Sequence, residues 1–358
     1  MHLNDKAKII LENGDEFEGF SFGAEHSVSG EVVFNTGMVG YPESLTDPSY
    51  KGQILVLTYP LIGNYGVPDK IKENGLLKYF ESNKIQIQAL AISDYSFEYS
   101  HWNAKKSLAE WLKEENIPAI YGIDTRKLTK TLREKGAMLG KIVINDEDIK
   151  LFDPNVIDIV KEVSIKEPVV YNEKPNQKKV VVIDCGVKDN IIRNLIARDL
   201  TVVRVPYDYD FLTQSFDGLV ISNGPGDPKM CKTTIANVKK ALEQEIPTFG
   251  ICLGNQIMAL AAGGDTYKLK YGHRSQNQPC ILVGTKRCYI TTQNHGFAVN
   301  MKTLEPEWQE YFVNANDGTN EGIKHKTKPF MAVQFHPEGT PGPNDTQFLF
   351  DEFLKMMK

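Results

Sequence analysis

The sequence lacks the features that mark membrane-spanning, secreted and disulfide-bonded proteins. No apolar run in its 358 residues approaches the roughly 20 residues that a membrane-spanning helix needs. Residues 1–6 show no apolar core behind a basic start, so no secretory signal is expected. The five cysteines are odd in number and form no C-x-x-C pair, which argues against a disulfide framework or a zinc site. We therefore expect a reducing compartment, and the cytoplasm is the simplest one.

An excess of charge of one sign is also lacking. The net charge is −5 at pH 7, with both signs scattered along the chain, which argues against nucleic acid or an anionic membrane as the main partner. The chain has no G-x-x-x-x-G-K-[ST] phosphate loop and no cluster of metal ligands in its sequence, so we expect neither ATP chemistry nor a metal site on it. With 41% hydrophobic and 24% charged residues, the chain resembles an ordinary globular protein, and its length suggests two domains.

Residues 1–150 have the pattern of a mixed, β-rich α/β domain. Two short apolar runs, 8–11 and 16–20, flank an Asn-Gly turn signal and predict a hairpin. Residues 31–34 and 53–58 are further β-rich runs. Apolar residues at helical spacing predict a helix over 105–115, and Asp124 or Thr125 would cap a second one.

The amino-acid composition changes before the second half of the sequence. Pro154, Pro168 and Pro175 stand among lysine, glutamate and asparagine, which is typical of an extended connection between domains. We therefore predict a linker over residues 151–178, with the domain boundary near residue 178.

Residues 179–358 alternate between strand and helix patterns. The continuous apolar runs of this region are typical of buried parallel strands, and amphipathic segments separate them. Strands are expected over 179–184, 201–205, 218–222, 247–251, 287–292 and 331–335, and helices over 189–198, 233–245 and 256–262. This order predicts an α/β fold in which a doubly wound, mostly parallel sheet carries helices on both faces.

Cys252 stands at a predicted turn between a buried strand and a helix. Gly250 and Gly254 flank it in a G-x-C-x-G arrangement, which is a version of the elbow that lifts a nucleophile above a sheet edge. The N-terminus of the following helix directs N–H groups and its positive dipole end at the sulfur, and both favour the thiolate. A buried structural cysteine is the alternative, and the other four cysteines are interpreted in that way.

His336 and Glu338 offer the proton chemistry that a thiolate nucleophile requires. His336 ends an expected strand in the same sheet as Cys252, and Pro337 stops that strand. Glu338 can reach back to one imidazole nitrogen and so fix the tautomer and orientation of the ring. Taken alone, the histidine of an H-P-E tripeptide is more often an ordinary loop residue than a catalytic one.

The turn over residues 223–228 is a candidate oxyanion site. Gly226 has no Cβ and can present its backbone N–H close to a ligand, and Leu253 N–H, next to the nucleophile, would be the second donor. A plain turn after a strand satisfies the same N-G-P-G-D-P pattern.

Together these motifs resemble the class I (triad-type) glutamine amidotransferases. The motifs are N-G-P-G-D-P (223–228), G-I-C-L-G-N-Q (250–256) and F-H-P-E (335–338), in this order within residues 179–358. The resemblance implies a Cys252, His336 and Glu338 triad that releases ammonia from glutamine through a γ-glutamyl thioester. Asn255 departs from the pattern, since many members of the family have histidine there.

The rest of the chain is similar to the small (glutaminase) subunit of carbamoyl-phosphate synthetase, or to the equivalent domain of a multifunctional pyrimidine-synthesis polypeptide. The similarity rests on G-E-V-V-F-N-T-G-M (30–38), L-T-D-P-S-Y (45–50), G-I-D-T-R-K-L-T (122–129), Q-N-H-G-F-A-V (293–299) and G-T-P-G-P (339–343). It implies that residues 1–150 contact a partner and form one side of the glutamine pocket. The glutamine-binding residues that it implies are Ser49, Gly224, Gly226, Leu253, Gln256, Asn294, Gly296 and Phe297.

The same resemblance implies a partner. Ammonia would pass to a synthetase subunit or fused domain that makes carbamoyl phosphate from bicarbonate and two ATP, for pyrimidine or arginine synthesis. ATP, Mg²⁺ and bicarbonate are expected on that partner, and this chain is expected to hold no cofactor. The sequence leaves open which of the two pathways is served, and whether the chain is a free subunit or part of a larger polypeptide.

Three alternatives stay open. One is the glutaminase of an anthranilate, GMP or CTP synthase, although residues 1–150 argue against it. A second is a regulatory or scaffolding subunit with an inactive amidotransferase fold, which the presence of all three triad residues opposes. The third is a cysteine peptidase, in which residues 224–228 would have to shape a peptide cleft.

Overall fold

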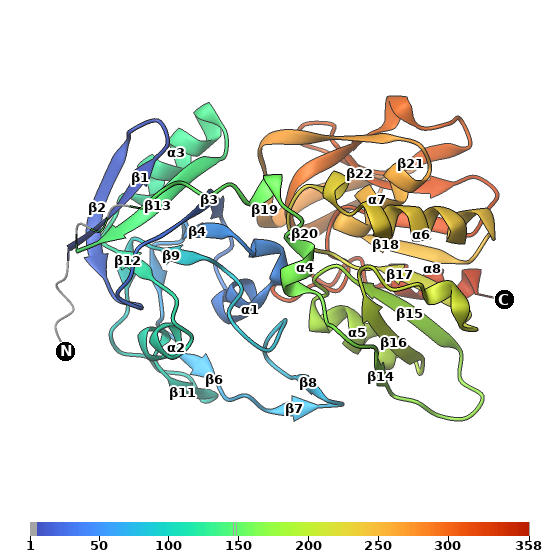
Figure 1. The fold of residues 1–358 in the computed structure, drawn as a ribbon, viewed down its shortest axis with the longest axis horizontal. Helices are drawn as coiled ribbons and strands as arrows, with labels where there is room; N and C mark the ends of the chain where they lie inside the picture. The colour runs from blue at the N-terminus through green and yellow to red at the C-terminus, as the bar shows by residue number, and fades with distance from the viewer. Residues whose placement is uncertain (1–5, 146, 148, 358) are drawn as a thin grey trace. The chain divides into compact units, whose positions relative to one another are not determined.

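The chain folds into two compact units, residues 1–157 and residues 158–358 (Figure 1). The computed structural model describes residues 6–145, 147 and 149–357. Residues 1–5, over which the sequence predicts no secretory signal, lie outside the described residues. Among the residues that the structure describes, none of the helices has the length and apolar character needed to cross a membrane.

A closed β-barrel forms the core of the first unit. Around the barrel the strands follow the order β1, β13, β3, β4, β9, β12 and β2. Their bounds are β1 (Lys6–Leu11), β2 (Glu16–Ser21), β3 (Val28–Asn35), β4 (Gln53–Leu57), β9 (Ala89–Ala91), β12 (Ala119–Tyr121) and β13 (Met138–Ile144). The predicted hairpin is the antiparallel pair β1–β2, whereas β3, β4, β9 and β12 pair in parallel, so the domain is mixed and β-rich as predicted.

Short helices and two-stranded ribbons surround this barrel. The helical segments are α1 (Tyr41–Thr46), α2 (Leu108–Glu114), α3 (Thr125–Lys135), η1 (Pro48–Tyr50) and η2 (Pro154–Val156), and the short strands are β5 (Leu61–Ile62), β6 (Val67–Pro68), β7 (Lys72–Glu73), β8 (Leu76–Leu77), β10 (Asp94–Tyr95) and β11 (Ala104–Lys106). Both long helices begin at a side-chain cap. Ser107 and Glu110 form a capping box on α2, and the Asp124 carboxylate accepts from Lys127 N–H at the start of α3.

A ten-stranded sheet organises the second unit. Its order is β14, β16, β15, β17, β18, β23, β22, β21, β19 and β20. The bounds are β14 (Val169–Tyr171), β15 (Lys179–Asp184), β16 (Thr201–Pro206), β17 (Gly218–Ile221), β18 (Thr248–Ile251), β19 (Asp265–Leu282), β20 (Cys288–Asn300), β21 (Trp308–Asn314), β22 (Asn320–His325) and β23 (Phe330–Val333). The neighbours β16, β15, β17, β18 and β23 pair in parallel, and the other pairs of the sheet are antiparallel. The α/β class is therefore confirmed, with parallel pairing in the part of the sheet that the apolar runs predicted.

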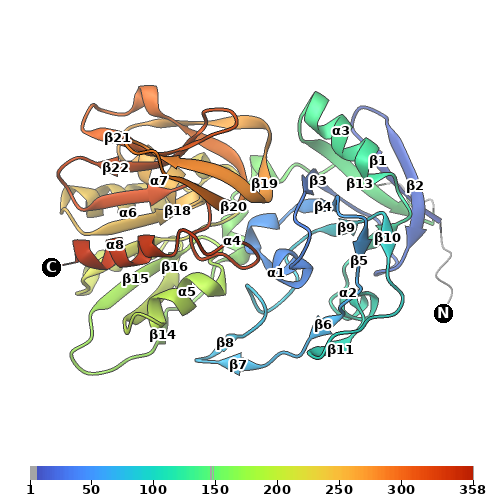
Figure 2. The ribbon, with the colours of Figure 1, turned by 180° about the vertical axis from the view of Figure 1, so that it is seen from behind.

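Helices cover both faces of this sheet. They are α4 (Val160–Val163), α5 (Asp189–Ile196), α6 (Lys232–Glu243), α7 (Leu253–Ala261) and α8 (Phe348–Met356), with short turns η3 (Phe211–Thr213), η4 (Pro228–Met230) and η5 (Met301–Thr303). On one face, α6 and α7 bury Val238 and Ile257 in the core that contains Leu219. On the other face, Phe353 of α8 packs on Phe249 with ring centroids 5.8 Å apart, and Figures 1 and 2 show the two helix layers from opposite sides.

Residues 158–178 differ from the predicted linker, because they belong to the second unit. They contain α4 and the edge strand β14, which pairs antiparallel with β16. Pro168 and Pro175 lie on either side of β14 rather than within it, and among the described strands this edge strand pairs through its backbone with β16 alone. The prolines thus lie outside a short strand. The sequence predicted an extended connection here because linkers have the same proline-rich, polar composition.

Candidate active site

Cys252 lies on a tight elbow between β18 and α7. Its backbone has φ 55° and ψ −103°, a conformation that is strained for a residue with a side chain and is typical of functional turns. Close packing also requires glycine at position 254, because a Cβ there would lie 2.1 Å from Ile221 O. The helix begins at Leu253, three residues earlier than predicted, so its N-terminal N–H groups lie directly beside the cysteine.

The sulfur of Cys252 lies in a buried, polar environment. The side chain is 2% exposed, and Cys252 N–H donates to Val333 O at 2.8 Å. Two polar atoms lie 3.7 Å from Sγ, namely the carbonyl oxygen of Asn294 and the amide nitrogen of Gln334. The dipole of α7 adds a positive field at this position, which favours a thiolate.

His336 and Glu338 form a buried pair at the end of β23. His336 N–H donates to Thr292 O at 2.9 Å, which anchors this segment to β20. Its Nδ1 lies 2.7 Å from Glu338 Oε1, and both side chains are almost fully buried. Since a carboxylate only accepts, Nδ1–H donates to it, and Nε2 is the ring nitrogen left for proton transfer. Within the described part of the chain, Nε2 has no hydrogen-bond partner.

The electrostatics of this pair favour opposite charges on its two members. Burial acts to lower the pKa of His336, but the charges of Glu338 and Cys252 raise it above its ordinary value overall. Burial acts to raise the pKa of Glu338, but Lys188 and His336 lower it overall. The site is therefore suited to hold an imidazolium between a carboxylate and a thiolate. The catalytic roles of Cys252, His336 and Glu338 stay predictions.

Lys188 and Gln334 contact the proposed triad, and neither residue was predicted from the sequence. Lys188 is buried, and its Nζ lies 2.9 Å from Glu338 Oε1 and donates to Gly339 O at 2.9 Å. Gln334 is fully buried against the sulfur of Cys252. The only available signals were a lysine directly before an expected helix and a glutamine two residues before His336. Neither signal indicates a partner, because the contacts join segments that are distant in sequence.

The predicted oxyanion residues lie at the carboxyl ends of adjacent parallel strands. Gly224 and Gly226 follow β17, while Leu253 follows β18, and these two strands are hydrogen-bonded neighbours. Gly226 has φ +83°, a left-handed conformation that favours glycine. The position of these residues fits a site at the end of the sheet, and their role as N–H donors stays a prediction.

Among the predicted glutamine-binding residues of the second unit, Leu253 and Gln256 lie in the first turn of α7, and β20 carries Asn294, Gly296 and Phe297. Gln256 Nε2 donates to Phe297 O at 2.8 Å, which joins α7 to β20. Ser49 lies in the first unit within η1, where its N–H donates to Asp47 Oδ1 at 2.9 Å. The role of Ser49 in glutamine binding stays a prediction.

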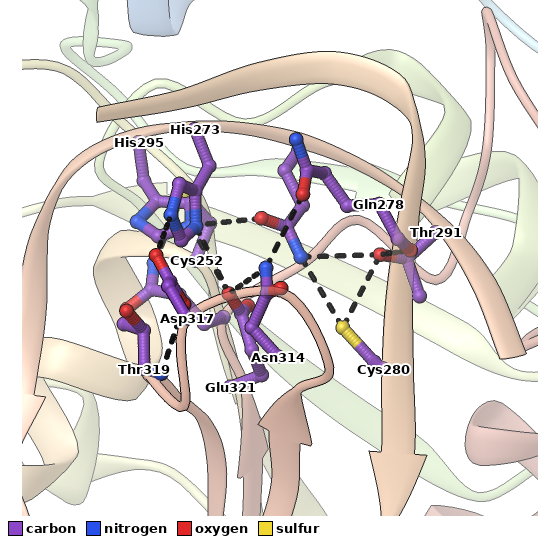
Figure 3. A network of polar contacts seen from close by, with 12 residues as sticks. Cys252, His273, Gln278, Cys280, Thr291, His295, Asn314, Asp317, Thr319 and Glu321 are labelled. Carbon is purple, nitrogen blue, oxygen red and sulfur yellow. Dashed lines mark hydrogen bonds and ion pairs between the residues drawn. The ribbon is translucent and has the colours of Figure 1, made fainter. Parts of the chain in front are cut away.

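A second buried cluster, also missed from the sequence, lies beside the elbow (Figure 3). The ligand atoms of His273, His295 and Glu321 lie within 4.8 Å of one another. His273 has a carboxylate at each ring nitrogen, Glu321 at 3.1 Å and Asp317 at 2.8 Å. Burial lowers the pKa of His273, but these carboxylates raise it overall. Since a carboxylate only accepts, both ring nitrogens of His273 donate, which is the arrangement of an imidazolium.

Comparison with known proteins gives a consistent result for both units. Residues 181–356 match the model of the family Glutamine amidotransferase class-I, and residues 9–142 match that of Carbamoyl-phosphate synthase small chain, CPSase domain. The chain is 57% identical over 355 residues to the Multifunctional protein CAD of Squalus acanthias, with 98% of this chain and 16% of that protein covered. It is 51% identical over 384 residues to the Multifunctional protein ura1 of Schizosaccharomyces pombe, with 98% and 17% covered. It is 52% identical over 356 residues to the mitochondrial Carbamoyl-phosphate synthase (ammonia) of Homo sapiens, with 98% and 24% covered.

Proposed function

Because the chain belongs to the carbamoyl-phosphate synthase small-chain family with a class-I glutamine amidotransferase domain, we propose that it is the glutaminase part of a carbamoyl-phosphate synthase. In this role it hydrolyses glutamine and passes the ammonia to a synthetase subunit or domain. The observation that carries the proposal is the strained elbow of Cys252 beside the buried His336–Glu338 pair.

The first half of the proposed reaction forms a thioester. The Cys252 thiolate attacks the side-chain amide carbon of glutamine, so that a C–S bond forms and an electron pair moves to the oxygen. Backbone N–H groups of Leu253 and Gly226 donate to this oxyanion. His336 gives its Nε2 proton to the amide nitrogen, the C–N bond breaks, and ammonia leaves.

The second half releases glutamate. His336 Nε2 takes a proton from water as the water oxygen attacks the thioester carbon. The C–S bond then breaks, and the electron pair returns to the sulfur as thiolate. Throughout both halves Glu338 holds Nδ1–H and stabilises the imidazolium, while Lys188 holds Glu338 in its ionised form.

Glutamine binding is proposed for the residues that the family resemblance implies. The substrate carries a zwitterionic head, which requires N–H donors, hydroxyl groups and amides rather than one net charge. The proposed contacts are Ser49, Gly224, Gly226, Leu253, Gln256, Asn294, Gly296 and Phe297.

The synthetase partner, its cofactors and the compartment are proposals as well. The chain spans between about a sixth and a quarter of the length of the relatives named above, so most of each relative lies outside the matched region. We propose that the partner binds ATP, Mg²⁺ and bicarbonate and that no cofactor binds this chain. Carbamoyl phosphate would then serve pyrimidine or arginine synthesis. The free cysteines support a reducing compartment such as the cytoplasm, although the human relative is named as a mitochondrial protein.

The names of the relatives leave the nitrogen source of this chain open, because the name of the human relative specifies ammonia. Use of glutamine is therefore supported by the geometry around Cys252 rather than by identity. The small-chain match over residues 9–142 argues against the glutaminase of an anthranilate, GMP or CTP synthase. An inactive regulatory domain is the alternative that an activity measurement must exclude.

Replacing Cys252 by serine separates these possibilities. In the full polypeptide or complex, Cys252→Ser is expected to reduce glutamine-dependent carbamoyl phosphate formation by more than about 10³-fold, because the nucleophile is lost. Ammonia-dependent formation is expected to stay unchanged, because the synthetase chemistry lies elsewhere. Cys288→Ser, which alters an exposed cysteine, is the control. A variant that lost both activities, or kept both, would contradict the proposal.

A further inference from the structure

Gln334 lies beside Cys252 because the two parallel strands that precede these residues are in register. β18 and β23 are neighbours, and Ile251 lies opposite Val333. The next residue of each strand is therefore placed side by side at the carboxyl edge of the sheet, where Cys252 N–H donates to Val333 O. Gln334 is fully buried here, with its Nε2 3.7 Å from Cys252 Sγ.

The orientation of the Gln334 amide follows from a backbone carbonyl. Phe297 O can only accept, so the Gln256 atom that lies 2.8 Å from it must be the nitrogen. The same Gln256 nitrogen lies 3.0 Å from the near end of the Gln334 amide, so that end must be the oxygen. The far end of the Gln334 amide is therefore the NH₂ group, and it faces the sulfur.

Asn255 supplies a second donor to the same oxygen. Its Nδ2 lies 3.2 Å from Gln334 Oε1, so two amide groups from the first turn of α7 hold one oxygen. Asn255 is fully buried, and within the described residues its own Oδ1 has no hydrogen-bond partner. A buried amide that leaves its acceptor unused is present here for its donor. Position 255 is also where the chain departs from the histidine of many related amidotransferases.

The sulfur has opposite requirements in its two protonation states. The Asn294 carbonyl, 3.7 Å from Sγ, can accept from a thiol S–H but offers nothing to a thiolate. The Gln334 amide favours the thiolate, since a hydrogen bond from N–H becomes stronger when its acceptor becomes charged. The two groups thus favour different states of Cys252, and burial strengthens both effects by excluding water.

We propose that Gln334 is a further catalytic residue, whose amide N–H stabilises the thiolate form of Cys252 and is held in that orientation by Asn255 and Gln256. This inference rests on the proposed function, because it assumes that Cys252 is the nucleophile. Gln334 also acts in the second half of the reaction, when the C–S bond breaks and the thiolate is the leaving group. Its loss therefore slows both formation and hydrolysis of the thioester.

The test measures the pH dependence of Cys252 alkylation by iodoacetamide in the full chain, with mass spectrometry to distinguish the five cysteines. Gln334→Met keeps the size of the side chain and removes the N–H donor. A hydrogen bond to a charged group that is lost in this way is expected to move the midpoint upward by about one pH unit. Below the midpoint, alkylation then slows about tenfold at a given pH. Gln86→Met, which removes a buried amide in the first unit, is the matched control and is expected to leave the midpoint unchanged.

A second variant keeps the inference testable if Gln334→Met does not fold. Asn255→Ala leaves Gln334 in place but removes one of its two anchoring donors, and it is expected to move the midpoint in the same direction by a smaller amount. The role of Gln334 would be overturned if folded Gln334→Met showed the same pH profile of alkylation as the wild type. If Gln334→Met does not fold, the same result for folded Asn255→Ala would overturn it. If wild-type Cys252 resists alkylation and the chain hydrolyses no glutamine, the proposed function fails instead.

Discussion

Replacing Lys188 by methionine should destabilise the second unit, because it leaves a buried carboxylate without its strongest partner. The side chains of Lys188 and Glu338 are 4% and 0% exposed, and the Nζ–Oε1 distance is 2.9 Å. Methionine keeps most of the apolar stem of the lysine and removes the charge. Glu338 would then retain the hydrogen bond from His336 Nδ1 at 2.7 Å.

The expected size of this effect follows from the geometry. At 2.9 Å and an effective dielectric constant of about 20, the direct attraction is about 6 kcal/mol, part of which offsets the desolvation of both charges. Breaking a buried pair by removing one partner costs about 3–5 kcal/mol, and the remaining His336 places this case near the lower end. We therefore expect a loss of about 3 kcal/mol in the free energy of unfolding.

A matched control comes from the surface of the same unit. Lys174 lies 2.8 Å from Asp199, but these side chains are 55% and 73% exposed, so Lys174→Met is expected to cost at most about 1 kcal/mol. Urea unfolding can be followed with Trp102 and Trp111 replaced by phenylalanine. Of the three tryptophans, only Trp308 then remains, and it lies in the second unit. Its fluorescence therefore reports on the unit that contains Lys188. With an m-value of about 3 kcal/mol/M, Lys188→Met should lower the midpoint by about 1 M.

The pH dependence gives an independent check of the same reasoning. The pKa of Glu338 is lowered in the folded protein, although burial opposes this, so its ionised form stabilises the fold above its unfolded pKa of about 4.3. This contribution is lost as the pH falls through the folded value, and the difference between wild type and Lys188→Met should shrink there. A variant within about 0.5 kcal/mol of wild type near neutral pH, and no more affected than Lys174→Met, would refute the argument.

Two further predictions concern the histidine and the elbow. The pKa of His336 is raised, so its contribution to stability is complete below an unfolded pKa of about 6.5 and is lost as the pH rises through the folded value. The difference in unfolding free energy between wild type and His336→Asn should therefore narrow above about pH 6.5, by up to about 1.4 kcal/mol per unit, and a constant difference would contradict the charged state. Gly254→Ala places a Cβ 2.1 Å from Ile221 O and should lower the free energy of unfolding by about 3 kcal/mol. It should also abolish most of the proposed glutaminase activity. At Gly263 a Cβ meets nothing within 4 Å, so Gly263→Ala carries only the cost of a left-handed backbone (φ +88°) and should cost less. Equal losses in thermal unfolding would count against the steric explanation.

The elements whose patterns are local were predictable from the sequence. Continuous apolar runs predicted the parallel strands β15 to β18, and the hairpin β1–β2 followed from two alternating runs around an Asn-Gly turn. The cysteine elbow followed from its flanking glycines, and the family resemblance followed from the order of short motifs. Residues 158–178 were predicted as linker rather than as part of the second unit, because proline and polar residues occur both in linkers and around short edge strands.

The sequence by itself determined the nucleophile candidate and the histidine and glutamate assigned to it, because their motifs are contiguous. Only the tertiary structure decided that Lys188 pairs with Glu338, that Gln334 directs an N–H at Cys252, and that His273 lies between two carboxylates. These contacts join strands whose order in the sheet differs from their order in the chain. Hydrogen bonds and charges act through distance in space, and that distance is set by strand register and sheet order rather than by spacing in the sequence.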